Sequence, residues 1–171
     1  MHNIEPLNRE NENNMDENVY FERTQIIELL VRYFSAIDDK CLDLSIIETT
    51  FTNEARIKRP NGSALVGHNN ILDSQKKSFD RFKATHHVTT DYIIDINDNR
   101  AVIRMNLTAM HLWADNVNNP TLTNKHFLAG AIIFAKAIKI DCKWRLSELT
   151  NQNVWRTGDG MTEMANFERP Q

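Results

Sequence analysis

The most regular pattern of apolar and polar positions begins just after residue 22. Apolar residues recur there at helical spacing and polar residues fall opposite; the apolar set is Ile26, Ile27, Leu29, Leu30, Val31, Tyr33, Phe34 and Ile37. The pattern predicts a helix that ends near Asp38. Because Asp38 continues one stripe of this face in steps of three and four residues, we expect it to face inward and Asp39 to face water.

Two shorter helices are predicted after this one. The first covers Leu44 to Phe51, and the second runs from Gly67 or His68 to Phe82, beyond a loop that contains Gly62. Three helices therefore precede the segments described next.

From His86 onward the pattern is typical of strands. Segments rich in branched and aromatic residues alternate with turn residues, over His87–Ile96, Ala101–Trp113, Leu122–Ile140 and Trp144–Trp155. Helices followed by successive antiparallel strands indicate an α+β domain rather than a doubly wound sheet.

Residues 1–20 are rich in Asn and Glu and poor in apolar side chains. Burial in such a segment would not offset the entropy lost on ordering it. We therefore expect a disordered N-terminal tail over 1–20, one domain over 21–160 and a C-terminal tail over 161–171.

The first predicted strand turn decides which histidines share a face. With a three-residue loop, Asn97 pairs with Ala101 and the ladder places His87 opposite His111, so both imidazoles lie on one face. With a two-residue loop, His87 pairs with Met110 and His111 points to the other side. Our working hypothesis is the first register.

Composition and charge narrow the classes of function. The chain has 171 residues, of which 41% are hydrophobic and 25% charged, enough for one sizeable core. A net charge of −3 with scattered Lys and Arg gives no patch for nucleic acid. No apolar run is long enough to span a membrane, and no signal-peptide pattern precedes the first helix, so we expect a cytoplasmic protein. Neither a metal-ligand cluster nor a Gly-rich phosphate loop occurs, and no metal or cofactor is expected.

Asp38, His87 and His111 are the candidate catalytic residues. Histidine ionises near neutral pH, and a carboxylate beside it orients the ring and balances its charge. If they meet in one pocket, the three side chains can transfer a proton to and from a bound molecule. The alternative is that Asp38 caps the helix and that the histidines are hydrogen-bonded core residues.

Several short motifs, in order, resemble one known family. They are Tyr33-Phe34-Ser35-Ala36-Ile37-Asp38, Phe51-Thr52-Asn53-Glu54-Ala55, Gly67, Thr85-His86-His87, Ala109-Met110-His111, Trp144-Arg145-Leu146 and Trp155-Arg156-Thr157-Gly158. Their order and spacing over residues 22–160 are similar to those of SnoaL-like proteins of the nuclear transport factor two-like superfamily. That superfamily includes scytalone dehydratase, bile-acid dehydratase and ketosteroid isomerase.

The resemblance implies a cone-shaped α+β barrel, in which a curved, mostly antiparallel sheet packs around three N-terminal helices and leaves an apolar pocket. It implies the catalytic roles of Asp38, His87 and His111, and a homodimer or larger homo-oligomer formed through the outer face of the sheet. It also places Ile37 where scytalone dehydratase carries a tyrosine, and Ile132 where many relatives carry a polar aromatic residue. We expect the pocket to be lined by Tyr33, Ile37, Trp113, Ile132, Phe134 and Trp155.

The function expected from these features is a cofactor-independent dehydratase or isomerase. Its substrate would be a small, mostly apolar molecule that bears a carbonyl or a hydroxyl. Two alternatives remain open: a cyclase of polyketide or other secondary metabolism, and a non-catalytic module for ligand binding or oligomerisation.

Overall fold

The computed structural model describes residues 9–59, 62–115 and 119–167. Its helices are α1 (Arg9–Asp38), α2 (Leu44–Thr50), α3 (His68–Phe79) and α4 (Met161–Phe167), with a short 3-10 helix over Pro120–Leu122. Its strands are β1 (Phe51–Lys58), β2 (Ala64–Val66), β3 (Phe82–Asn97), β4 (Arg100–Trp113), β5 (His126–Ile140) and β6 (Lys143–Gly158). They form one six-stranded sheet in the order β2-β1-β6-β5-β4-β3.

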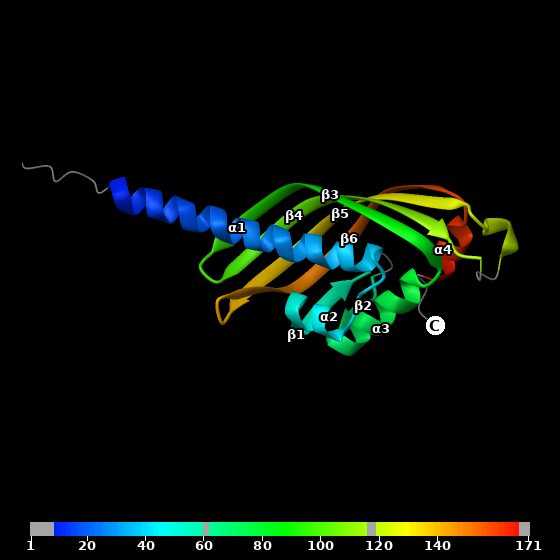
Figure 1. Ribbon diagram of the computed structural model, residues 1–171, viewed down its shortest axis with the longest axis horizontal. Coiled ribbons are helices and arrows are strands. Elements are labelled where there is room, and N and C mark those ends of the chain that lie inside the picture. The colour runs from blue at the N-terminus through cyan, green and yellow to red at the C-terminus, as the bar shows by residue number, and fades with distance from the viewer. Residues whose placement is uncertain (1–8, 60–61, 116–118, 168–171) are drawn as a thin grey trace, which may run out of the picture.

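The sheet is curved, and α1 lies across one of its faces (Figure 1). Every neighbouring pair of strands is antiparallel except β1 and β6, which are parallel. Within the described residues the sheet ends at β2 on one side and β3 on the other, so the barrel is open. The predicted α+β class, with a curved and mostly antiparallel sheet around the helices, is confirmed.

The first helix is longer than its apolar pattern predicts. It begins at Arg9, and its early turns project beyond the sheet (Figure 1). The expected disordered tail is therefore wrong for residues 9–20, whereas residues 1–8 lie outside the described part of the chain. Extending a helix costs far less than nucleating one, so an anchored helix can continue through polar residues that bury little surface.

The part of α1 that packs on the sheet places Asp38 inward, as expected. One residue of the predicted apolar face is nevertheless exposed. Ile26 and Leu30 are fully buried, but Val31 is 41% exposed. The most buried stripe therefore runs through Ile26, Leu30 and Ile37, about 100° around the helix from the stripe that contains Val31 and Asp38. Asp38 reaches the interior because it follows Ile37 at the very end of the helix.

Two short strands were not predicted. β1 follows α2 without a loop, and β2 pairs with it in antiparallel register. Conversely, the predicted start of the third long strand at Leu122 is wrong, because Pro120–Leu122 forms the 3-10 helix. Within the predicted C-terminal tail, Met161–Phe167 forms α4. Residues 60, 61, 116–118 and 168–171 lie outside the described part of the chain.

A β-bulge in β3 determines which histidine faces inward. At the hairpin tip Asn97 pairs with Arg100, so the loop has two residues and the expected three-residue loop is wrong. Between Thr90 and Ile93, however, two residues of β3 oppose one residue of β4. Asp91 occupies the bulge with a φ of 54°, a conformation that Asp tolerates better than most residues. The register therefore shifts by one, and His87 pairs with Ala109.

A second bulge, in β6, re-aims the side chains near its C-terminal end. Ala131 pairs with Asn153 but Gly130 pairs with Trp155, which leaves Val154 as the extra residue. Trp155 consequently lies on the outer face, directly over Gly130, where an added Cβ would meet the indole at 2.2 Å. Arg156, paired with Ala129, takes the inward position.

The core fills the space between α1 and the inner face of the sheet. The outer face instead exposes large apolar side chains, including Val102, Met110 and Phe134. A homo-oligomer formed through this face stays a prediction. No helix in the described part of the chain is long and apolar enough to span a membrane.

Candidate active site

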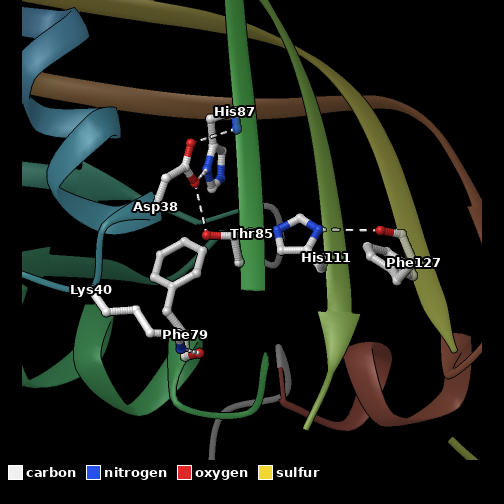
Figure 2. A network of polar contacts seen from close by, with 7 residues as sticks. All are labelled: Asp38, Lys40, Phe79, Thr85, His87, His111 and Phe127. Carbon is white, nitrogen blue, oxygen red and sulfur yellow. Dashed lines mark hydrogen bonds and ion pairs between the residues drawn. The ribbon is translucent and has the colours of Figure 1, made fainter. Parts of the chain in front are cut away.

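Asp38, the last residue of α1, is the centre of a hydrogen-bond cluster with β3 (Figure 2). Its Oδ1 atom accepts from the Thr85 hydroxyl at 2.8 Å and lies 2.6 Å from Nδ1 of His87. Its Oδ2 atom accepts from the backbone N–H of His87 at 2.7 Å. Both carboxylate oxygens are therefore engaged, and the end of the helix is fixed to the strand.

The cluster favours the ionised form of Asp38. Partial burial raises the pKa of the carboxyl group, but hydrogen bonds from the ring and backbone of His87, the charge of that imidazole and the Thr85 hydroxyl together lower the pKa to about 2. Asp38 is thus a carboxylate at any pH near neutral.

The same contacts fix the orientation of His87. A carboxylate can only accept a hydrogen bond, so Nδ1 of His87 must carry the proton that it shares with Asp38. The side chain of His87 is only 4% exposed and lines the main cavity. Its remaining ring nitrogen, Nε2, is therefore the atom available to exchange a proton with a molecule bound there.

His111 is held in its neutral form. Its Nδ1 atom donates to the carbonyl oxygen of Phe127 at 3.4 Å, a long hydrogen bond. Burial lowers the pKa of the imidazole, and the charge of His87 adds to this, giving a value of about 4. With Nδ1 protonated, Nε2 of His111 is a hydrogen-bond acceptor at neutral pH.

The two imidazoles lie close together within an aromatic enclosure. Their ring centroids are 5.5 Å apart and their planes are nearly perpendicular. Phe79 contacts both rings, at centroid distances of 5.6 Å to His87 and 6.3 Å to His111. Phe34 packs on His87, and Phe82 packs on His111 at 4.6 Å. These side chains keep the surroundings of the histidines apolar.

The cavity beside the histidines has a volume of about 170 Å³. An apolar cavity of about 150 Å³ can hold benzene, so the space admits a small organic molecule. It exists because the inner face of the sheet carries small residues between its polar ends: Ala109, Ala129 and Ala131 all line it. We call these three residues the alanine floor.

The expected pocket lining is right at two positions only. Tyr33 and Ile37 of α1 line the cavity, and the Tyr33 hydroxyl accepts from Nε2 of Gln75 at 2.7 Å. Burial raises the pKa of Tyr33, so its hydroxyl stays protonated. The other four expected residues do not line the cavity.

Each of the four misplaced residues has a physical reason. Ala131 and Ile133 of β5 point inward, so the alternate residues Ile132 and Phe134 point outward, and Phe134 is 43% exposed. Trp155 is turned outward by the bulge in β6 and is 46% exposed. Trp113 is fully buried in a separate cluster, where its indole N–H donates to the carbonyl oxygen of Asp159.

Other residues of the site were missed by the sequence reasoning. Thr85 fixes Asp38, and Asn151, Asn153 and Arg156 of β6 line the far end of the cavity together with Arg59. Asn151 and Asn153 are two residues apart on a strand and so share a face, which could have indicated a pair of polar side chains pointing inward. Arg156 could not have been found in this way, because the bulge precedes it.

Within the described residues, no three His, Cys, Asp or Glu side chains are arranged to hold a metal ion. Cys41 and Cys142 are both free and exposed.

We expect His111 to make folding sensitive to mild acid. The unfolded chain protonates this residue near pH 6.5, whereas the folded chain does so only near pH 4. Between these values the unfolded state binds more protons, so the free energy of unfolding should fall as the pH is lowered. Urea unfolding at pH 7 and pH 5 should show a smaller loss for His111→Gln than for the unmodified protein. Equal losses would contradict the assignment.

Comparison with known proteins gives a family and a fold. The family model of the SnoaL-like domain matches residues 21–150. No curated protein sequence matches the chain significantly.

Solved structures show a similar fold at low sequence identity. A scytalone dehydratase-like protein from Novosphingobium aromaticivorans is 16% identical, with a TM-score of 0.71 over 84% of this chain and 90% of that one. The hexachlorocyclohexane dehydrochlorinase LinA-type3 from Novosphingobium barchaimii is 14% identical, with a TM-score of 0.71 over 85% and 95%. A nuclear transport factor 2-like superfamily protein from Salmonella enterica is 18% identical, with a TM-score of 0.68 over 84% and 98%.

Proposed function

Since the chain belongs to the SnoaL-like family, we propose that it is a cofactor-independent lyase or isomerase, and specifically a dehydratase of a small hydroxylated carbonyl compound. The observation that carries this proposal is the contact of Asp38 with Nδ1 of His87, which leaves Nε2 of His87 beside an apolar cavity. Two proteins of similar fold are named for elimination reactions, a dehydratase and a dehydrochlorinase.

His87 is the proposed general base and acid. Its Nε2 atom takes a proton from the carbon next to the substrate carbonyl, and Asp38 stabilises the imidazolium that forms. His87 then returns this proton to the departing hydroxyl group, so that the C–O bond breaks, a C=C bond forms and water leaves. Return of the proton to a different carbon would give isomerisation instead.

His111 has a different proposed role from that of His87. As a neutral imidazole with Nδ1 engaged, it accepts a hydrogen bond from the substrate hydroxyl rather than donating a proton. It thereby holds the leaving group beside His87. The aromatic enclosure excludes water, which strengthens these interactions and favours the reactive orientation.

A simple β-hydroxyketone tests the proposal. 3-Hydroxycyclohexanone matches the cavity in size, and its dehydration gives cyclohexenone, whose conjugation is followed by ultraviolet absorbance. Cyclohexanone in D₂O reports the first half-reaction alone, through loss of its α-proton signals by NMR. We expect the protein to accelerate both reactions. Rates equal to those in buffer for both compounds would contradict a proton-transfer site and favour the non-catalytic alternative.

Filling the alanine floor should weaken ligand binding without unfolding the chain. Ala109 lines the cavity and pairs with His87, whereas Thr108, one residue earlier, is exposed on the outer face. We expect Ala109→Leu to weaken cyclohexanone binding by about tenfold or more, because the added carbons occupy the cavity, a loss of over ~1.4 kcal/mol. Thr108→Leu is the matched control. NMR titration measures both, and equal binding by the two variants would place the ligand elsewhere.

A further inference from the structure

The end of the cavity away from the catalytic pair carries polar side chains that the proposed chemistry does not use. Asn151, Asn153 and Arg156 occupy inward positions of β6, and Arg59 directly follows β1. Because Lys58 pairs with Thr150 in the parallel β1–β6 ladder, Arg59 lies level with Asn151. We call these four residues the arginine end.

The charge of the cavity lining is one-sided. Its charged side chains are Lys58, Arg59 and Arg156, and within the described residues no Asp or Glu lines it. Asp38, the carboxylate that contacts the catalytic pair, is bonded to His87 and Thr85 and is not among the lining residues. A bound anion would therefore meet cations without an opposing carboxylate in the wall.

The two guanidinium groups are held in place by neighbours. Arg59 donates from Nη2 to the Ser74 hydroxyl of α3. Asn153 lies against Arg156, and its amide oxygen accepts from Nε at 3.1 Å in the orientation that pairs donor with acceptor. A guanidinium has five N–H donors and matches a carboxylate in geometry, so each can keep its neighbour while binding an anion.

The two ends of the cavity lie on one row of the sheet. His87, Ala109, Ala129 and Arg156 are successive partners on β3, β4, β5 and β6. With strands about 4.8 Å apart, the backbones at the ends of this row are roughly 14 Å apart. The alanine floor lies between them, so one small molecule can contact both ends.

We propose that the natural substrate is an organic anion, a hydroxylated carboxylic acid whose carboxylate binds Arg59 and Arg156. The reacting carbon of the same molecule then lies over the alanine floor near His87. The assignment of the reacting end rests on the proposed function; the assignment of the anion does not.

Matched aromatic ligands test the charge preference. 4-Hydroxybenzoate and 4-hydroxybenzamide have nearly the same shape but differ in charge. By calorimetry we expect 4-hydroxybenzoate to bind at least tenfold more tightly than the amide. Added salt should weaken binding of the acid and leave that of the amide unchanged. Equal affinity for the acid and the amide, or no binding by either, would overturn the proposal.

Substitutions then assign the contacts. We expect Arg59→Gln and Arg156→Gln each to weaken 4-hydroxybenzoate about tenfold while leaving the amide unchanged, and Arg59→Lys to lose less. Arg56→Gln is the matched control, because Arg56 is exposed and lies on β1, the strand that ends directly before Arg59. Unchanged affinity in both arginine-to-glutamine variants would reject the arginine end as the anion site.

His87→Gln separates this inference from the proposed function. The variant should bind 4-hydroxybenzoate as tightly as the unmodified protein, since the carboxylate is held at the opposite end. If turnover survives in His87→Gln but acid binding depends on Arg59, the catalytic proposal fails and the anion site stands. If turnover is lost in His87→Gln and the acid and the amide bind alike, the catalytic proposal stands and the anion site is rejected.

Discussion

His87→Gln is expected to lower the rate of α-proton exchange and dehydration by about 10²–10⁴-fold, the range that a positioned acid–base group contributes. Glutamine keeps a polar group of similar length that can still donate to Asp38, but it has no atom that takes up a proton near neutral pH. Binding of cyclohexanone should persist, because the alanine floor is untouched. The measurement is the exchange rate in D₂O at saturating ligand.

His86→Gln is the matched control for this variant. The two histidines are adjacent, but His86 pairs with Met110 and is exposed, outside the cavity lining. We expect its substitution to leave the rate within about twofold of normal, which is small beside the 10²-fold loss expected at His87. Equal rates for both variants would remove His87 from the mechanism.

Asp38→Asn should lower the rate by a similar factor through the tautomer of His87. One amide oxygen must replace two carboxylate oxygens that together accept from Thr85, the His87 ring and the His87 backbone. The backbone N–H can only donate, so the amide oxygen will face it and the amide NH₂ will face the ring. The His87 proton then moves to Nε2, which presents an N–H instead of a lone pair to the substrate.

Nitrogen NMR of the imidazole distinguishes this explanation from unfolding. We expect the Nδ1–H form of His87 in the unmodified protein and the Nε2–H form in Asp38→Asn, with the rate reduced about 10²–10⁴-fold. Asp39→Asn is the matched control, because Asp39 is exposed and follows the helix end. An unchanged tautomer together with a low rate would contradict the orienting role of Asp38.

The same variant should change the acid stability of the protein. The pKa of Asp38 is about 2 in the folded chain and near 3.8 in the unfolded one. Its contribution is therefore fully present above about pH 4 and is lost as the pH falls towards 2. The difference in the free energy of unfolding between the unmodified protein and Asp38→Asn should shrink over that interval.

Local patterns in the sequence were sufficient for the fold class and for the inward position of Asp38. Helical spacing and strand composition depend on neighbouring residues, and burial of one face enforces both. β1 and β2 escaped prediction because each is short and is stabilised by pairing: β1 lies beside β6, about ninety positions further along the chain. The helical start of α1 escaped because polar composition was taken to exclude extension from an anchored helix.

The prediction that His87 and His111 share one face of the sheet was derived from an incorrect loop length. The loop has two residues, and by itself it would have placed the imidazoles on opposite faces, but the extra residue near Asp91 restores their common side. Bulges are not encoded by alternation of apolar and polar residues, so strand-by-strand reasoning fails beyond each one. Trp155 and Arg156 exchanged their expected faces for the same reason.

Straightening this bulge, with every residue kept in the strand, would therefore rotate this part of β3 by half a turn. With the hairpin tip fixed, His86 would then pair with His111 and point inward, while His87 and Thr85 would point to solvent. Because His86 and His87 are adjacent, one imidazole points inward in either register of the strand. The hydroxyl that anchors Asp38 has no such duplicate, because Ala84 and His86 would take the inward positions in place of Thr85 and His87. A straightened strand would therefore keep an inward imidazole and lose the hydroxyl that steadies the carboxylate.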